Sequence, residues 1–364
     1  MKIYIAATRQ NDGKTIASLG LIAAMLKRTD KVGYIKPVGQ HCIETDGHKI
    51  DEDAILIKET YGLDCSLPDM SPVAVPRGFT EAYIDNPNRN RLISKVDEAF
   101  VRVSKGKKYV LIEGTGHAGV GSVFDMSNAD VAKLLGAKVI IISSGGVGRP
   151  IDEIMLNKAL FDRVGVEVLG AIINKTQFEK YEKIEPFVRK GLIRKGLDVF
   201  GVMPHIPMLS SPTLEQLLGA IDGDLLSGEL GLKNHVNRIA IGAMSPHEAL
   251  TYLGEGTLLI TPGTREDLIL AAMSLYLLGK DEESHISGIV LTGGMRPHKK
   301  VLNFITRTDI PVVIVKDDTF TAATKINNLM VKIQPGEKDK IETAEQLVSQ
   351  YVDVDRLLDK ISET

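Results

Sequence analysis

With 364 residues, 43% of them hydrophobic and 25% charged, the chain has the composition of an ordinary folded protein and more residues than one hydrophobic core usually covers, which predicts two domains. Its formal net charge of -3 and its lack of Trp argue against nucleic acid as a partner, and no apolar run is long enough to cross a membrane. The two cysteines, Cys42 and Cys65, form neither a disulfide framework nor a metal-ligand pair, so we expect a reducing, cytoplasmic location.

The first predicted strand, residues 3–7, leads through a short loop into a predicted helix that ends near Lys27. The loop reads Thr8-Arg9-Gln10-Asn11-Asp12-Gly13-Lys14-Thr15, which places Gly-Lys-Thr at the helix start. Such a loop cradles phosphates, because its backbone N–H groups and the helix dipole face an anion, its Lys reaches the β/γ-phosphates and its Thr binds Mg²⁺. Although Thr8 stands where the usual pattern has a Gly, the context favours a phosphate site over a chance match, formed by Thr8, Asn11, Asp12, Gly13, Lys14, Thr15 and Ile16.

Apolar strand-like runs then alternate with helical patterns up to about residue 206, which predicts an α/β domain with a mostly parallel sheet and helices on both faces. The predicted strands cover residues 3–7, 32–36, 109–113, 139–143, 168–174 and 199–203. A polar stretch at 38–78 separates the second strand from the third, and within it only 53–61 has a helical pattern. Long irregular connections in compact domains often form lids or binding loops.

Charged side chains near the strand ends are candidates for completing a nucleotide site. Glu113 closes a buried strand and is followed by Gly, a position where phosphate-loop proteins place a Mg²⁺ acid and where an exposed Glu is the alternative. Asp53 lies in Asp51-Glu52-Asp53, which heads a predicted helix and could equally serve as a cap. Lys36, before a rigid Pro, is a candidate contact for a γ-phosphate or an anionic substrate, or else an ordinary strand-end Lys.

Two further features leave their roles open. Asn174, at the end of a predicted strand, could hydrogen-bond a purine or form a turn. The segment 114–119 fits the G-x-G-x-x-G fingerprint of dinucleotide folds, but no helix begins within it and no acid closes the next strand, which argues against NAD. His117 within this segment is either a phosphate or substrate contact or a plain surface residue.

The second half of the chain follows a cluster of prolines and a Gly-rich segment. We assign residues 1–212 to the first domain, 213–235 to a linker and 236–364 to a second, smaller α/β domain without a phosphate loop. The predicted strands of the second domain cover 238–243, 257–261, 288–292 and 311–315, and they alternate with predicted helices at 247–253, 265–278, 300–306 and 319–328. The tail at 344–362 has an amphipathic helical pattern.

Residues 1 to about 210 resemble dethiobiotin synthetase and related cobyrinate-amidating enzymes. The matching segments are Ala7-Thr8 through Gly13-Lys14-Thr15, Lys36-Pro37-Val38, Asp53-Ala54, Glu113-Gly114-Thr115-Gly116, Ala129-Asp130 and Asn174. The resemblance implies that ATP and Mg²⁺ bind, with Lys14 and Lys36 on the phosphates and a carbamate-like substrate. It also implies that Thr15, Asp53 and Glu113 hold Mg²⁺ and that Asn174 touches the adenine. Arg9 stands where related partitioning and metal-insertion ATPases carry a signature Lys, so Lys14, Lys36 and Arg9 are the candidate catalytic residues.

Residues 236 to about 360 resemble the DRTGG domain. The matching segments are Pro262-Gly263-Thr264-Arg265, Leu291-Thr292-Gly293-Gly294 and Asp318-Thr319-Phe320, with Thr264 in place of the signature Asp. The two halves together are similar to the N-terminal regulatory segment of long bacterial phosphotransacetylases.

The resemblance leaves two functional hypotheses. One is an ATP-dependent ligase that activates a carboxylate or carbamate near Lys36, although Gly39-Gln40-His41-Cys42 lacks the hydroxyl residues with which the synthetase holds its substrate. The other is a nucleotide sensor whose second domain binds an effector or mediates assembly. In both, the expected partners are ATP, a small anionic substrate or effector, and further copies of the chain.

Overall fold

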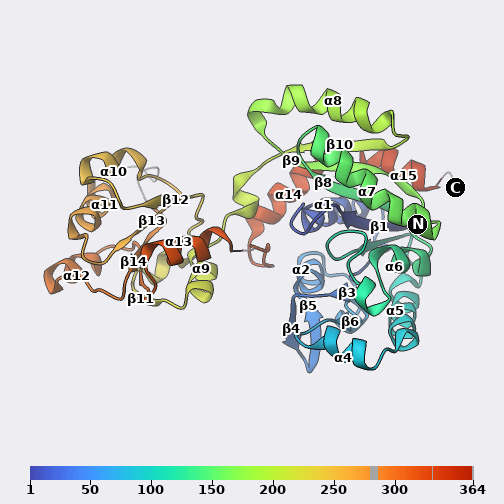
Figure 1. Ribbon diagram of the computed structural model, residues 1–364, viewed down its shortest axis with the longest axis horizontal. Coiled ribbons are helices and arrows are strands. Elements are labelled where there is room, and N and C mark those ends of the chain that lie inside the picture. Colours follow the sequence, from blue (N-terminus) through green and yellow to red (C-terminus); the bar gives the residue numbers. More distant parts are fainter. Residues whose placement is uncertain (279–285, 330, 363–364) are drawn as a thin grey trace. The chain divides into compact units, whose positions relative to one another are not determined.

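The computed structural model describes residues 1–278, 286–329 and 331–362, and these form two compact units (Figure 1). Unit 1 joins Met1–Ile206 to Ile333–Thr364, and unit 2 is Pro207–Lys332. Unit 2 is therefore inserted into the chain of unit 1. This grouping differs from the boundaries expected from the sequence, which assigned the C-terminal tail to the second domain.

A six-stranded parallel sheet forms the centre of unit 1 within the described residues, in the order β10-β9-β8-β1-β7-β2. Its strands are apolar and almost entirely buried, as expected for a parallel sheet covered on both faces. They are β1 (Lys2–Ala7), β2 (Val32–Ile35), β7 (Tyr109–Glu113), β8 (Lys138–Ser144), β9 (Val168–Thr176) and β10 (Asp198–Pro204). The predicted α/β fold class and the predicted strands of this half are confirmed.

The connections place helices on both faces of this sheet. The chain crosses in one direction from β1 to β2 and in the other from β2 to β10, so right-handed crossovers put the helix after β1 opposite the helices that follow β2, β7, β8 and β9. These helices are α1 (Lys14–Leu26), α5 (Arg89–Ser104), α6 (Asn128–Leu135), α7 (Gly148–Val164) and α8 (Tyr181–Ile193). The connections that follow the adjacent strands β1 and β8 lead in opposite directions, and open α/β sheets bind ligands beyond the carboxyl ends of the strands at such a point.

The stretch between β2 and α5 contains more structure than its sequence indicates. Its elements are β3 (Val38–Gly39), β4 (Cys42–Thr45), β5 (His48–Asp51), α2 (Glu52–Tyr61), α3 (Leu67–Met70), β6 (Val73–Ala74) and α4 (Phe79–Asp85). β4 and β5 form an antiparallel hairpin. Because most of the hairpin's side chains are polar and partly or fully exposed, it lacks the apolar alternation from which strands are predicted.

The C-terminal tail forms α14 (Lys338–Tyr351) and α15 (Val354–Ser362) of unit 1. α14 packs along α1, where Gly20 lies so close to Val348 that a Cβ at Gly20 would be 2.2 Å from the Val348 Cβ. The Tyr61 hydroxyl lies 2.8 Å from Glu345 Oε1 on α14 and 2.9 Å from the Leu19 carbonyl oxygen on α1. The tail therefore completes the core of unit 1 on the α1 face of the sheet.

Unit 2 is a smaller α/β unit. Within the described residues its sheet has the order β11-β15-β14-β13-β12, in which β12 (Arg238–Ile241), β13 (Thr257–Pro262), β14 (Gly288–Thr292) and β15 (Val312–Ile314) are parallel and β11 (Asp224–Ser227) is antiparallel. One face is covered by α10 (Pro246–Tyr252), α11 (Glu266–Leu278) and α12 (Lys299–Ile305), and the other by α9 (Leu214–Ile221) and α13 (Thr319–Asn327).

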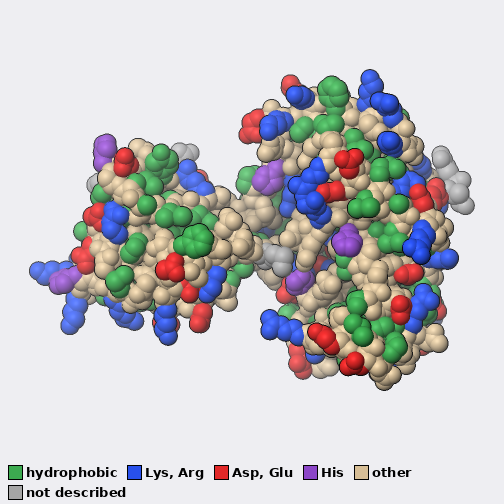
Figure 2. Space-filling view, viewed as in Figure 1, with side chains coloured by type: hydrophobic (Ala, Val, Ile, Leu, Met, Phe, Trp, Pro, Cys, Tyr) green, Lys and Arg blue, Asp and Glu red, His purple; other side chains and the backbone are tan. Residues whose placement is uncertain are grey.

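The segment 213–235 contains α9 and β11 and packs into the core of unit 2, so its assignment as a linker is wrong. Its glycines signal turns and close packing: a Cβ at Gly228 would lie 2.4 Å from the backbone of Ile310. Among the described residues, no helix has both the length and the apolar character needed to cross a membrane. Figure 2 shows Lys and Arg side chains interspersed with Asp and Glu on the visible face of both units.

Candidate functional site

The β1–α1 loop, residues 8–13, turns tightly between the central strand and the following helix. Asn11 and Gly13 adopt left-handed backbone conformations, with φ of 65° and 99°. Gly13 is also required by space, because a Cβ there would lie 2.0 Å from Asn174 Nδ2. α1 then begins at Lys14 and, within the described chain, has no side-chain cap at this end. The first N–H groups of the helix and the positive end of its dipole are therefore available to an anion.

The side chain of Asp12 closes this loop. Its Oδ2 accepts hydrogen bonds from the Thr8 hydroxyl and from the Arg9 backbone N–H, each at 2.7 Å. The Thr8 hydroxyl also lies 3.1 Å from Ser143 Oγ at the end of β8. Burial raises the pKa of the Asp12 carboxyl, and the Thr8 hydrogen bond opposes this rise. Thr8, which stands where the usual motif has Gly, thus ties the loop to the neighbouring strand.

Lys14 is the first residue of α1. The residue is only 8% exposed, and its ammonium forms no hydrogen bond or ion pair with another described residue. Burial lowers its pKa, whereas the negative charges of Glu113 and Asp53 raise it. An ammonium without a hydrogen-bonding partner, carried by a largely buried residue at a helix start, is suited to a bound anion.

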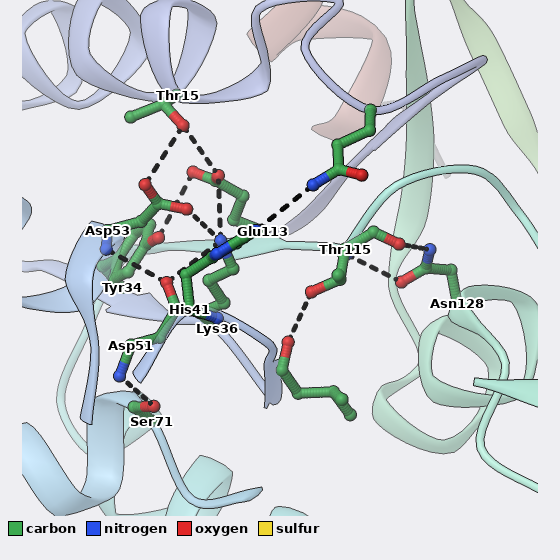
Figure 3. A network of polar contacts seen from close by, with 12 residues as sticks. Thr15, Tyr34, Lys36, His41, Asp51, Asp53, Ser71, Glu113, Thr115 and Asn128 are labelled. Carbon is green, nitrogen blue, oxygen red and sulfur yellow. Dashed lines mark hydrogen bonds and ion pairs between the residues drawn. The ribbon is translucent and has the colours of Figure 1, made fainter. Parts of the chain in front are cut away.

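Three oxygen-bearing side chains meet, from α1, α2 and the end of β7 (Figure 3). The Thr15 hydroxyl lies 3.2 Å from Glu113 Oε1 and 3.4 Å from Asp53 Oδ1. Tyr34 in β2 donates a hydrogen bond of 3.2 Å to the other oxygen of Glu113. The structure thus brings together Thr15, Asp53 and Glu113, the three residues expected from the sequence to hold a metal.

Lys36 lies among the carboxylates of this cluster. Its Nζ pairs with Asp53 Oδ2 and lies 3.2 Å from Asp51 Oδ1 and 3.7 Å from Glu113 Oε1. Burial lowers the pKa of Lys36, but the three carboxylates outweigh it and raise the pKa overall. Burial likewise raises the pKa of Glu113, against the lowering effect of Lys36. The ammonium is therefore held charged and enclosed by acids.

Thr15, Asp53 and Glu113 offer some of the oxygen ligands that a Mg²⁺ ion needs. A hydroxyl and two carboxylates are the hard oxygen ligands that Mg²⁺ prefers, and Mg²⁺ commonly keeps several waters and shares phosphate oxygens with a substrate. Among the described residues, no group of three or more His, Cys, Asp and Glu side chains could hold a metal ion alone. A bound Mg²⁺ would therefore need oxygens from its nucleotide and from water.

The other predicted site residues lie in the β1–α1 loop or against it. Arg9 is half-exposed and pairs with Glu153 on α7. Asn174 donates from Nδ2 to the Asp12 carbonyl oxygen at 2.9 Å, and its Oδ1 accepts the Lys175 N–H at 2.8 Å. Sequence reasoning did not identify Tyr34 or Lys175, since an isolated Tyr within a strand and a Lys after one carry no functional signal.

The segment 114–119, which fits the dinucleotide fingerprint, is held to α6 by Asn128. The Asn128 side chain donates to the carbonyl oxygens of Thr115 and His117 and accepts the Thr115 N–H. No helix begins within this described segment. The exposed His117 accepts the Gly119 N–H at 3.2 Å through Nδ1.

In unit 2, residues of the expected signature hold the carboxyl-end loops together. Gly263 packs so closely on the next loop that a Cβ would lie 1.6 Å from the Met295 carbonyl oxygen. The Thr292 and Thr319 hydroxyls are 2.8 Å apart. Arg265 donates to the Gly242 carbonyl oxygen at 3.0 Å.

Comparison with known families identifies both parts of the chain. Residues 1–213 match the family described as AAA domain, and residues 216–329 match the family described as DRTGG domain. The expected combination of these two domain types is confirmed. The resemblance to dethiobiotin synthetase remains a sequence-based expectation.

The chain is similar to phosphate acetyltransferases over nearly its whole length. It is 30% identical to that of Nitratidesulfovibrio vulgaris over 98% of this chain and 51% of the relative, and 25% identical to that of Synechocystis over 98% and 51%. The chain thus spans about half the length of the curated relatives it matches. Among solved structures, the MinC:MinD cell division protein complex of Aquifex aeolicus is 14% identical, with a TM-score of 0.37 over 57% of this chain and 83% of that chain.

Proposed function

The chain belongs to the AAA domain family through residues 1–213, and from this membership and the geometry of the site we propose that unit 1 binds the Mg²⁺ complex of ATP at the β1–α1 loop. We propose further that the chain is a nucleotide-responsive regulatory protein, with the DRTGG domain as its effector-binding or assembly part.

The observation that carries the nucleotide proposal is the state of Lys14. The residue is largely buried, its ammonium has no hydrogen-bond or ion-pair partner among the described residues, and it stands at a helix start without a side-chain cap. A triphosphate would accept hydrogen bonds from the Lys14 ammonium and from the loop N–H groups. In a purely structural loop the Lys14 ammonium would remain without a hydrogen-bonding partner.

Thr15, Asp53 and Glu113 would hold Mg²⁺ next to the phosphates. The ion would neutralise phosphate charge and polarise a phosphoryl oxygen. The residues of this chain would do the rest: Tyr34 fixes Glu113, and Lys36 balances the charge of Asp53 and Asp51. Arg9, a half-exposed residue of the loop, would add positive charge near the phosphates.

The sensor role is favoured over the ligase role by the position of Lys36. A ligase of the synthetase type would need this ammonium to contact its substrate, yet here it is buried and surrounded by three carboxylates. The relatives that align with 98% of the chain are phosphate acetyltransferases. This supports the proposal that the chain has a regulatory role and is not a separate ligase. The ligase remains the second candidate because Lys36 and Glu113 match its motifs.

Isothermal titration of the full chain with Mg-ATP tests the nucleotide proposal. We expect Lys14→Ala to weaken binding at least tenfold, about 1.4 kcal/mol or more, because a buried phosphate contact is lost. Lys27→Ala is the matched control, since Lys27 is exposed at the far end of the same helix and should leave the affinity unchanged. Unaltered affinity in Lys14→Ala would contradict the proposed site.

A second experiment separates the sensor from the ligase. The sensor proposal expects Mg-ATP to change the assembly state of the chain, measured by light scattering. The ligase alternative expects ATP consumption that depends on an added carboxylate or diamine. ADP release stimulated by such a substrate, with no change in scattering, would decide for the ligase.

A further inference from the structure

We propose that unit 2 binds a nucleoside phosphate at the carboxyl end of its sheet, between the loop that follows β14 (residues 293–298) and the loop that follows β15 (residues 315–318). Phe320 stacks on the base, and Lys316 and Arg296 bind the phosphate. This inference rests on the proposed role of the DRTGG domain as an effector-binding part, and it names the site and the chemical class of the effector.

The connections that follow the adjacent strands β14 and β15 leave the sheet on opposite faces. α12, after β14, covers one face together with α10 and α11, whereas α13, after β15, covers the other face together with α9. Open α/β sheets bind ligands beyond the carboxyl ends of two strands whose connections diverge in this way. The signature segment Thr292-Gly293-Gly294 begins at the last residue of β14. The signature therefore lies where the topology of unit 2 favours a ligand.

Several residues at this position have a structural role. The Thr292 and Thr319 hydroxyls are 2.8 Å apart, and the Gly293 N–H donates to the Asp317 carbonyl oxygen at 2.7 Å. Asp318 caps α13 by accepting two of its backbone N–H groups, at 2.9 and 3.0 Å. These contacts hold the two loops together, and they involve none of the side chains proposed to bind the ligand.

The side chains around these contacts are exposed and have no partner. Phe320 is 80% exposed in the first turn of α13, and Met295 in the other loop is 44% exposed. Lys316 and Arg296, one from each loop, are exposed, and neither side chain forms a hydrogen bond or ion pair with another described residue. The backbone N–H groups of Met295 and Arg296 also donate to no described residue. Two loops in contact thus present an aromatic ring, two cations and two N–H groups.

A nucleoside phosphate fits all of these groups. Bases stack on aromatic rings, and Lys and Arg side chains are common phosphate ligands. The acids of the β15 loop are already engaged, because Asp317 pairs with Lys325 at 2.6 Å and Asp318 caps α13. An inorganic anion would leave the ring without a partner, and an apolar peptide would leave the two cations without one.

Isothermal titration of the full chain with AMP, GMP, CMP and UMP tests the inference. Monophosphates lack the β- and γ-phosphates that Lys14 is proposed to bind, so they separate the site of unit 2 from that of unit 1. At least one of them should bind the wild type. Phe320→Ala should weaken it about five- to a hundredfold, as expected for one lost stacking contact, and Lys316→Met about two- to tenfold. Phe320→Trp should retain the affinity, because it keeps an aromatic ring.

Phe187→Ala is the matched control, since Phe187 is a 59% exposed aromatic residue on α8 of unit 1 and should leave the affinity unchanged. A wild type that binds none of the four monophosphates would overturn the inference, as would an unchanged affinity in Phe320→Ala. If circular dichroism shows that Phe320→Ala is not folded, Lys316→Met decides by the same comparison.

Two further results are distinguishable from these. A loss of monophosphate affinity in Lys14→Ala but not in Phe320→Ala would place the binding in unit 1 and overturn the inference. A change of assembly state in Phe320→Ala, seen by light scattering without any bound monophosphate, would assign these loops to assembly instead. The Mg-ATP titration of Lys14→Ala tests the proposed site of unit 1 independently of both results.

Discussion

Glu113 shows how a binding residue lowers the stability of the fold that contains it. It is fully buried at the end of β7, and burial raises the pKa of its carboxyl above the ordinary value of 4.5. A carboxyl with a raised pKa in the folded state binds its proton more tightly there than in the unfolded chain. Ionisation of Glu113 therefore lowers the free energy of unfolding at a pH above the pKa of the folded state. This destabilisation disappears as the pH falls toward 4.5.

At the residue scale we predict opposite effects of Glu113→Gln on stability and on metal binding. Without ligand, the variant should melt at a higher temperature than the wild type at neutral pH, because no buried charge must be formed. Each 1 kcal/mol gained should raise the melting temperature by about 2–4 °C. The difference should shrink as the pH is lowered through the wild-type pKa. Mg²⁺-dependent ATP affinity should fall at the same time.

Calorimetric melts over a pH series, combined with Mg²⁺ titrations, provide the measurement. Asp69→Asn is a control carboxylate of unit 1, since the Asp69 side chain is partly exposed and pairs with Arg102 away from Glu113. A variant that is less stable than the wild type at neutral pH, with unchanged Mg²⁺ dependence, would contradict the role given to Glu113.

The residues of the candidate site that lie at motif positions could be predicted from the sequence. Thr15, Asp53 and Glu113 could be grouped from the sequence because the ends of parallel strands and helix starts meet at one edge of a sheet. The partners of these residues could not. Tyr34 contacts Glu113 because β2 pairs with β7, and this pairing cannot be predicted from the local sequence of either strand.

At the element scale, α14 supports the helix that begins with Lys14. Gly20, in the middle of α1, lowers helix propensity but allows Val348 to approach. The sequence shows α14 as an amphipathic helix without indicating its neighbour, which is why the tail was expected in the second domain. The hairpin β4–β5 and the strand β11 were missed for a related reason, since short strands with partly exposed side chains lack periodicity.

We predict that Gly20→Ala destabilises the chain, although the same change in an exposed helix stabilises it by about 1 kcal/mol. The added methyl would overlap Val348, and overpacking of this kind costs about 1–3 kcal/mol. Combining Gly20→Ala with Val348→Ala should recover part of the loss, because the second change makes room for the methyl. Denaturant unfolding in a double-mutant cycle measures this coupling. Strictly additive losses would show that the two residues do not meet.

At the scale of the whole molecule, unit 2 is inserted between β10 and α14 of unit 1. The sequence indicated two α/β domains and their order, because each half has its own alternation of strands and helices. It did not indicate that unit 1 is completed after unit 2, since contacts between distant parts of a chain leave no local pattern. Both connections of unit 2 lead into unit 1, and one leads to the helix that packs on α1.

The insertion predicts how fragments of the chain behave. Residues 207–332 should unfold cooperatively when produced alone, because their sheet and both helical layers are complete. Residues 1–206 should be far less stable than unit 1 in the full chain, because loss of α14 exposes apolar side chains of α1. Thermal unfolding followed by circular dichroism compares the fragments with the full chain. A fragment 1–206 as stable as unit 1 in the full chain would refute this account of the tail.

The central claim is that the β1–α1 loop binds Mg-ATP, and a crystal structure of the full chain grown with Mg²⁺ and a non-hydrolysable ATP analogue tests it most directly. We predict a triphosphate bound to the Lys14 ammonium and the loop N–H groups, with Mg²⁺ next to Thr15 and Glu113. A nucleotide bound elsewhere, with Lys14 contacting no phosphate at a saturating concentration of the analogue, would contradict the claim.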